Sequence, residues 1–237
     1  MVVTITHIFS YWIIYAFIGW ILETIYCSIP QRKFVERGFL NGPLVPIYGF
    51  GAILILYVLD PYINDPVLVF VYGLLLTSSL EYITSFIMEK LFHMRWWDYS
   101  QQPYNIKGRV CLKNSLMFGF LCLILVTWVH PRIIDFINTI PQNVLTILAS
   151  VLFVIVVIDT IVSVASTMHL KNRVVNIHAM KDTLNSKITS LEHGVRDSLQ
   201  SLKRGELRIL RSFPSLSSRK FTDIMEEIKQ QVRQKKK

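Results

Sequence analysis

Charged side chains are scarce in this sequence of 237 residues: only 17% are Asp, Glu, Lys or Arg, whereas 52% are hydrophobic. This balance excludes an ordinary soluble domain. No Lys or Arg precedes Arg32, although the apolar run at the N-terminus continues for more than 20 residues. A cleaved signal peptide would have a basic start and an apolar region of about 7 to 15 residues. The first segment therefore predicts a retained membrane span.

Cysteine is also rare, and motifs of well-known enzyme classes are missing. Cys27, Cys111 and Cys122 are the three cysteines, and no C-x-x-C spacing occurs, which argues against a disulfide framework or a zinc site. The sequence contains no H-E-x-x-H, G-x-S-x-G or G-x-x-x-x-G-K-[ST] motif. Zinc proteases, hydrolases with a nucleophile elbow and P-loop ATPases are therefore not indicated. The histidines show no ligand spacing, so we expect no metal and no cofactor.

Long apolar segments dominate the remainder of the chain. A membrane-spanning helix needs about 20 mostly apolar residues, and five segments approach or exceed this length. They lie at about 6–28, 43–59, 66–91, 112–130 and 141–168. The second segment is the shortest and begins in a Gly/Pro-rich stretch, which predicts re-entrant or unwound backbone before it. The expected fold class is all-α, a polytopic membrane helix bundle of about five spans with a cytoplasmic helical tail.

The basic residues of the connections predict the orientation. The first connection contains Arg32, Lys33 and Arg37, and the third contains four further basic residues between 95 and 113. The second connection has none, and the fourth has only Arg132. Because cytoplasmic loops are enriched in Lys and Arg, we expect the N-terminus outside the cell membrane and the C-terminus in the cytoplasm.

The C-terminal part carries the excess positive charge. Residues 1–168, the predicted bundle, hold nine basic and nine acidic residues, whereas residues 169–237, the predicted tail, hold sixteen and seven. A basic segment beside a bilayer favours anionic lipids as partners, and no nucleic-acid motif is present. Apolar residues recur every three or four positions from Ile177 to Leu202, and again from Phe221 to Val232. They predict amphipathic helices that pack on each other, on a second copy as a homodimer, or on lipid.

Residues 37–51 form the most unusual connection, with four glycines and two prolines between two apolar segments. Such residues leave backbone groups without helical partners. Backbone of this kind is tolerated at membrane depth only when it is buried in protein or lines a wet cavity. We therefore expect residues 37–51 to form one wall of a site.

Ionisable residues inside the predicted spans point to the same site. Each costs about 2.5 to 3.5 kcal/mol at the centre of a bilayer and is a functional candidate by default. They are Glu23, Glu81, Glu89 and Asp159. The first three are the catalytic candidates, and the substrate-binding candidates are Arg37, Asn41, Tyr48, Trp97, Asp98, Asn105 and Arg109.

Three kinds of chemistry fit this set. The arginines could hold an anionic headgroup while a glutamate acts as a base or binds a divalent cation. The carboxylates could instead line a path for an ion or solute. The acids and arginines could also pair internally and hold the helices together.

Several short segments resemble a family of small membrane proteins described as "Putative ABC-transporter type IV", also called CmpB-like permeases. The resemblance covers residues of about 10 to 130 and implies a transporter permease that works with a separate ATPase subunit. An intramembrane enzyme acting on a lipid or lipid-linked phosphate is the alternative function, and a scaffold is a third. The similar segments are Gly-Trp-Ile-Leu-Glu-Thr at 19–24, Arg-Gly-Phe-Leu-Asn-Gly-Pro at 37–43 with Pro-Ile-Tyr-Gly at 46–49, Glu-Tyr at 81–82 with Ser85 and Glu89, Trp-Trp-Asp-Tyr-Ser at 96–100, and Asn105 with Gly-Arg-Val-Cys at 108–111.

Overall fold

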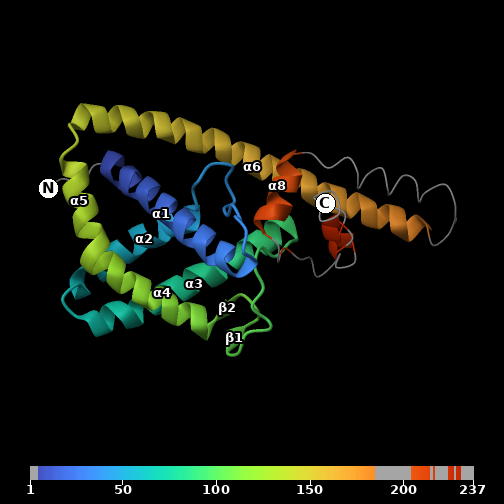
Figure 1. The fold of residues 1–237 in the computed structure, drawn as a ribbon, viewed down its shortest axis with the longest axis horizontal. Helices are drawn as coiled ribbons and strands as arrows, with labels where there is room; N and C mark the ends of the chain where they lie inside the picture. Colours follow the sequence, from blue (N-terminus) through green and yellow to red (C-terminus); the bar gives the residue numbers. More distant parts are fainter. Residues whose placement is uncertain (1–4, 185–203, 214–215, 217–223, 227, 231–237) are drawn as a thin grey trace. The chain divides into compact units, whose positions relative to one another are not determined.

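Helices make up almost all regular structure of the chain, which confirms the predicted all-α fold (Figure 1). The structure is a computed structural model that describes residues 5–184, 204–213, 216, 224–226 and 228–230. A two-residue hairpin pairs β1 with β2 antiparallel. The elements are α1 (Ile5–Gln31), α2 (Pro46–Leu59), a 3-10 turn (Asp60–Tyr62), α3 (Pro66–Phe92), β1 (Asn105–Ile106), β2 (Val110–Cys111), α4 (Leu112–Ile124), a π-helical turn (Leu125–Val129), α5 (His130–Asn138), α6 (Gln142–Leu184) and α8 (Arg204–Ser212).

Four of the five predicted spans are helices that are long and apolar enough to cross a membrane. They are Ile5–Gln31, Pro66–Phe92, Leu112–Asn138 and Gln142–Ala179. The remaining predicted span, the second along the chain at 43–59, corresponds to α2. Its 14 residues reach about 21 Å at 1.5 Å per residue. That length falls short of the ~30 Å hydrocarbon core. Residues 33–45 before α2 are not helical, as the glycines and prolines predict.

Prolines and an aspartate define where the helices begin. Pro46 opens α2 in the first turn, where its missing N–H has no helical partner to lose. Pro66 does the same for α3, and the Asp65 carboxylate caps that helix by accepting hydrogen bonds from the N–H groups of Val67 (3.0 Å) and Leu68 (3.1 Å).

The chain divides into two compact units. The first contains Met1–Thr84 and Tyr99–Thr160, and the second contains Ser85–Asp98 and Ile161–Lys237. The division predicted from charge, at residues 168 and 169, stays a prediction.

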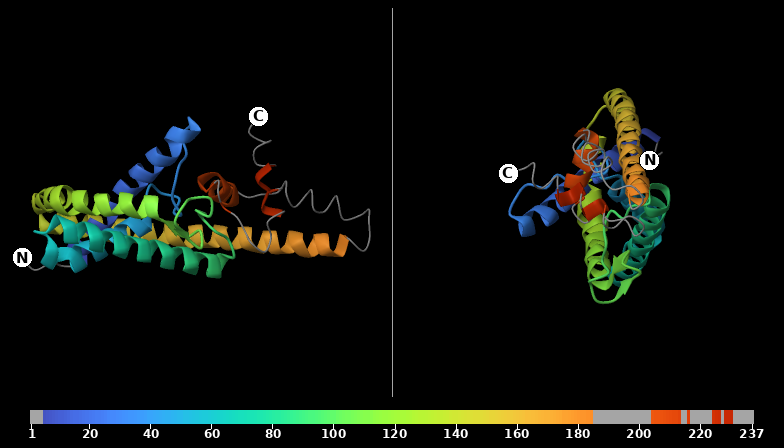
Figure 2. Two further views of the ribbon diagram at one scale, coloured as in Figure 1. Left: turned by 90° about the horizontal axis from the view of Figure 1, so that it is seen from below. Right: turned by 90° about the vertical axis from the view of Figure 1, so that its right-hand side faces the viewer.

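Small residues bring the helices of the first unit close together. The Tyr48 side chain lies directly against Gly19 of α1, and Trp12 lies against Gly49 of α2. Such glycines permit close approach of membrane helices. Between α3 and α4, Cys122 packs on Gly73 in the same way. Figure 2 shows that the C-terminal part of α1 diverges from α3 and α4.

Two apolar clusters fill the first unit. Tyr15 belongs to one of them, and its hydroxyl is hydrogen-bonded to His130 Nδ1 at 2.6 Å. The buried residues of this outer cluster, named for the predicted orientation, are Tyr11, Tyr15, Ala52, Ile133, Ile137 and Leu145. The other cluster consists of Ile55, Leu59, Val69, Cys122 and Val126.

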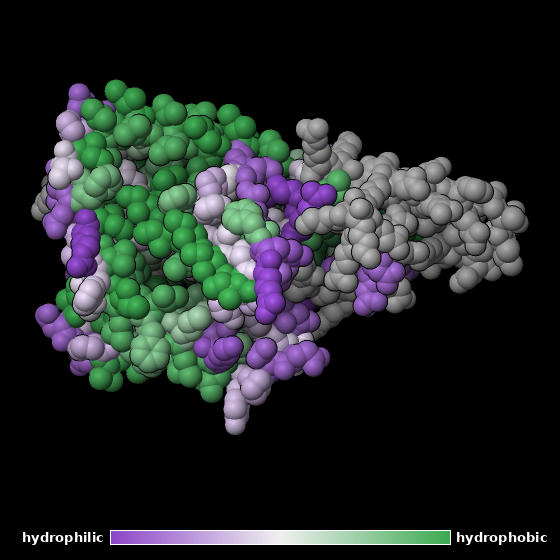
Figure 3. All heavy atoms as spheres, in the orientation of Figure 1, coloured by the Kyte–Doolittle hydropathy of each residue, from purple (hydrophilic) through white to green (hydrophobic). Residues whose placement is uncertain are grey.

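Hydrophobic residues also predominate on the outer surface of the helices on the side that Figure 3 shows. On α6, Phe153, Ile158 and Ile161 are each more than half exposed. Exposed apolar surface on this scale is unusual for soluble proteins and is what a bilayer requires. The chain is a multi-pass membrane protein.

In the second unit, α8 packs against α6 of the same chain. Gly205 lies against Ser166, and the Arg173 Nε donates to Glu206 Oε1 at 3.0 Å. The Glu206 side chain is almost fully buried, as are Leu170 and Ile209.

Only parts of the predicted tail helices are described. Ile224, Met225 and Ile228 are buried and helical, as their pattern predicts. The apolar positions between 185 and 203, and those at Phe221 and Val232, lie outside the described residues. A homodimer through the tail stays a prediction.

Candidate polar site within the membrane

The non-helical stretch between α1 and α2 runs back along α1. The Val35 N–H donates to Ser28 Oγ at 3.0 Å, near the end of that helix. The Val45 N–H donates to the Ala16 carbonyl at 3.0 Å, near its middle. Gly38 has a φ of +123°, a conformation that side chains rarely adopt. Residues 33–45 therefore lie beside the first span as irregular backbone.

Asp159, on α6, binds the centre of this stretch. Its Oδ1 accepts hydrogen bonds from the Asn41 N–H (2.8 Å) and the Asn41 Nδ2 (2.6 Å), and its Oδ2 accepts one from the Gly42 N–H (2.7 Å). A Cβ on Gly42 would lie only 3.3 Å from Oδ2. Asp159 thus supplies acceptors to backbone groups that have no helical partner. Asn41, a predicted substrate-binding residue, contributes to this contact.

An ion pair joins α1 to the same stretch. The Arg37 guanidinium donates to Glu23 Oε1 at 2.9 Å, and the arginine side chain is only 8% exposed. Tyr48, whose ring lies on Gly19 one turn before Glu23, interacts electrostatically with both members of the pair and with Glu81. Four predicted site residues from α1, the connection, α2 and α3 are therefore neighbours.

Glu81, on α3, is buried to the same degree and is held by a residue that the sequence analysis did not select. The Tyr99 hydroxyl donates to Glu81 Oε1 at 3.1 Å, and the Asn114 side chain hydrogen-bonds to Tyr99 in turn. Burial, followed by the nearby Glu81 carboxylate, raises the pKa of the Tyr99 phenol. Tyr99 therefore stays a neutral donor. The sequence feature that could have identified Tyr99 is its position in the Trp-Trp-Asp-Tyr-Ser segment at 96–100, which carries part of the family resemblance.

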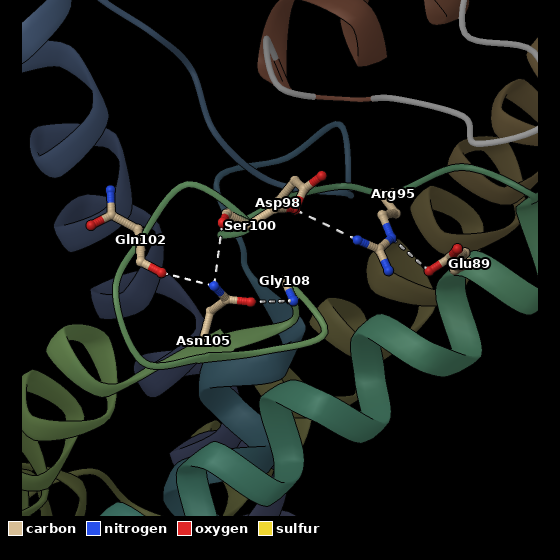
Figure 4. A network of polar contacts seen from close by, with 7 residues as sticks. All are labelled: Glu89, Arg95, Asp98, Ser100, Gln102, Asn105 and Gly108. Atoms are coloured by element: carbon tan, nitrogen blue, oxygen red, sulfur yellow. Dashed lines mark hydrogen bonds and ion pairs between the residues drawn. The ribbon is translucent and has the colours of Figure 1, made fainter.

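Asn105 and Arg109 belong to the loop between α3 and α4. The Asn105 side chain donates to the carbonyls of Gln102 (2.8 Å) and Ser100 (3.3 Å) and accepts from the Gly108 N–H (2.9 Å), so it shapes its own loop (Figure 4). Arg109 is buried, and its guanidinium lies over the Tyr82 ring at 5.6 Å. Its role in substrate binding stays a prediction.

Glu89, Trp97 and Asp98 belong to the second unit. There the buried Arg95 donates from Nε to Glu89 Oε2 at 2.8 Å and lies 3.5 Å from Asp98 Oδ1 (Figure 4). Trp97 is half-buried. Both carboxylates thus contact one arginine, which is an arrangement that stabilises the end of α3.

The chemistry of the first unit's polar site follows from its members. Glu23, Arg37, Tyr48, Glu81 and Tyr99 offer two carboxylates, one guanidinium and two hydroxyls from five separate segments. Within the described residues, no three His, Cys, Asp or Glu side chains are placed to hold a metal ion together. The site is suited to binding polar groups and to exchanging protons.

Residues 10–164 match the model of a family described as "Putative ABC-transporter type IV". No curated protein and no solved structure matches the chain.

The contact between Asp159 and residues 41–42 predicts a large effect on stability. Replacing Asp159 with Ala removes three hydrogen bonds to a carboxylate, and each contributes about 1 kcal/mol or more. We expect the free energy of unfolding, measured in mixed micelles with increasing SDS, to fall by about 3 kcal/mol or more. D159N keeps one accepting oxygen and should lose about half as much. Ile158→Ala, at the exposed neighbouring position, is the control, and an equal loss in that variant would contradict the assignment.

Proposed function

We propose that this chain, which belongs to the family described as "Putative ABC-transporter type IV", is the membrane-spanning component of a transport system. The observation that carries the proposal is the meeting of Glu23, Arg37, Tyr48 and Glu81 beside the irregular backbone of residues 33–45. Transporters build substrate sites in this way, from discontinuous helices and polar side chains inside the bundle. The polar site is the proposed solute site.

The proposed site opens toward the cytoplasm. Glu23 lies in the half of α1 that leads to Arg32 and Lys33, and basic connections mark the cytoplasmic side. In the other half of the first unit, the outer cluster and the hydrogen bond between Tyr15 and His130 fill the interior. This packing supports a site that is closed toward the outside.

Reporter fusions test the orientation. Green fluorescent protein fused after Lys237 should fluoresce, because it matures on the cytoplasmic side, and alkaline phosphatase at the same position should be inactive. Fusions to a chain truncated after Asn64 should give the opposite pattern, because that connection is predicted to lie outside. The reverse result at both positions would contradict the proposed orientation.

A separate ATPase subunit is the proposed partner, because this sequence has no P-loop motif. The basic residues near the membrane also favour anionic lipids as partners.

The alternative, an enzyme acting on a lipid or lipid-linked phosphate, would need Arg37 to capture an anion. In the structure the Arg37 guanidinium is paired with Glu23, so such capture would have to compete with a partly buried ion pair. This competition favours the transport proposal.

The function is tested with Glu81→Gln, which keeps the size of the side chain and removes its charge. Affinity-tagged chain should co-purify with an ATPase subunit in the wild type and in the variant.

In vesicles, solute uptake by the variant should fall at least about tenfold, equivalent to 1.4 kcal/mol. Glu36→Gln, at an exposed position of the first connection, should retain uptake. Wild-type chain that brings down no ATPase and moves no solute would contradict the proposal, and a change in lipid composition on deletion would favour the enzyme.

A further inference from the structure

Only one oxygen of the Glu81 carboxyl group is hydrogen-bonded within the described part of the chain. Oε1 accepts from the Tyr99 hydroxyl at 3.1 Å. Oε2 is buried, and no described residue donates to it or accepts from it. The side chain as a whole is only 7% exposed. A buried oxygen without a partner is costly unless something else satisfies it.

The groups around Glu81 leave its charge without a dedicated counterion. Glu23 faces it from α1, Tyr48 from α2 and Tyr99 from the loop after α3. Arg37 is the cation of this set, and it is paired with Glu23 at 2.9 Å. The two glutamates and this arginine therefore carry one net negative charge when all three are ionised.

The Arg109 guanidinium lies over the ring of Tyr82, the residue after Glu81, at 5.6 Å from the ring centre. Successive residues of a helix point about 100° apart, so Tyr82 and Glu81 leave α3 in different directions.

The direction of the hydrogen bonds identifies where a proton would bind. The Tyr99 hydroxyl has one proton and donates it to Glu81 Oε1, so the Tyr99 oxygen is left to accept from the Asn114 amide, to which it is also hydrogen-bonded. Oε2 is the remaining position. A proton there removes the net charge, whereas an ionised carboxylate would leave a buried oxygen without a hydrogen-bond donor among the described residues.

We propose that Glu81 is a proton-binding group that takes up a proton on Oε2 from water and returns it to water, so that movement of solute through the site is linked to protons. The carboxylate becomes a neutral carboxylic acid when it takes up the proton, and the net charge of the site falls to zero. Tyr99 is the positioning residue, because its hydroxyl fixes Oε1. The link to solute movement rests on the proposed transport function, whereas proton binding itself does not.

Difference infrared spectroscopy of the purified full chain in lipid nanodiscs reads this proton directly. The wild type should show the carbonyl stretch of a protonated carboxylic acid, and this band should disappear as the pH is raised. Glu81→Gln should lack the band, whereas Glu36→Gln, the exposed control, should retain it. Tyr99→Phe loses the donor that favours the ionised form, so the band should persist to higher pH. This shift keeps the test decisive if Glu81→Gln does not fold.

Two results would overturn the inference. One is a set of bands that is the same in the wild type and in Glu81→Gln, with no shift in Tyr99→Phe. The other is a Glu81-dependent change that follows sodium or potassium concentration and not pH, which would assign a metal cation instead. The infrared measurement needs no ATPase and no solute. A chain that shows the Glu81 band and moves no solute therefore contradicts the transport proposal alone.

Discussion

Backbone that is not helical must still satisfy its hydrogen-bonding groups inside a membrane, and this requirement governs the structure around residues 33–45. Water is absent from the hydrocarbon core, so each unsatisfied N–H or C=O costs several kcal/mol. Asp159 meets the requirement for Asn41 and Gly42 with three hydrogen bonds of 2.6–2.8 Å. A charged residue in the apolar part of a membrane helix is costly by itself. The hydrogen bonds between Asp159 and residues 41–42 reduce both this cost and the cost of the unpaired backbone N–H groups.

The polar site depends on this arrangement. Residues 33–45 carry Arg37 to Glu23, and Pro46 then starts α2, which places Tyr48 on Gly19. If the stretch continued as a helix away from α1, Arg37 and Tyr48 could not both reach α1, the one at Glu23 and the other at Gly19 one turn before it. The irregular backbone thus brings a cation and a hydroxyl close to the half-buried Glu23 and the buried Glu81.

Much of this could be predicted from the sequence. The apolar segments predict the four long helices, and the glycines and prolines of residues 37–51 predict the irregular connection. The cost of buried charge selects Glu23 and Glu81 as candidates. All of these inferences use composition or local spacing, which a single sequence contains.

Partners far apart in the chain could not be predicted in the same way. Asp159 lies 118 residues from Asn41, and nothing in either segment indicates that they meet. For this reason the sequence predicts Asn41 as a substrate-binding residue but gives no sign of its contact with Asp159. In the same way it predicts Asn105 as a substrate-binding residue but not the hydrogen bonds that its amide makes within its own loop. Tyr99 was missed because an aromatic residue next to two tryptophans is typical of a membrane interface.

An experimental density map of the chain in lipid nanodiscs tests the central claim most directly. The account predicts extended backbone at residues 33–45, with the Asp159 carboxylate within hydrogen-bonding distance of the Asn41 and Gly42 N–H groups and Arg37 on Glu23. A continuous helix through this stretch, or an Asp159 side chain that faces lipid, would contradict it.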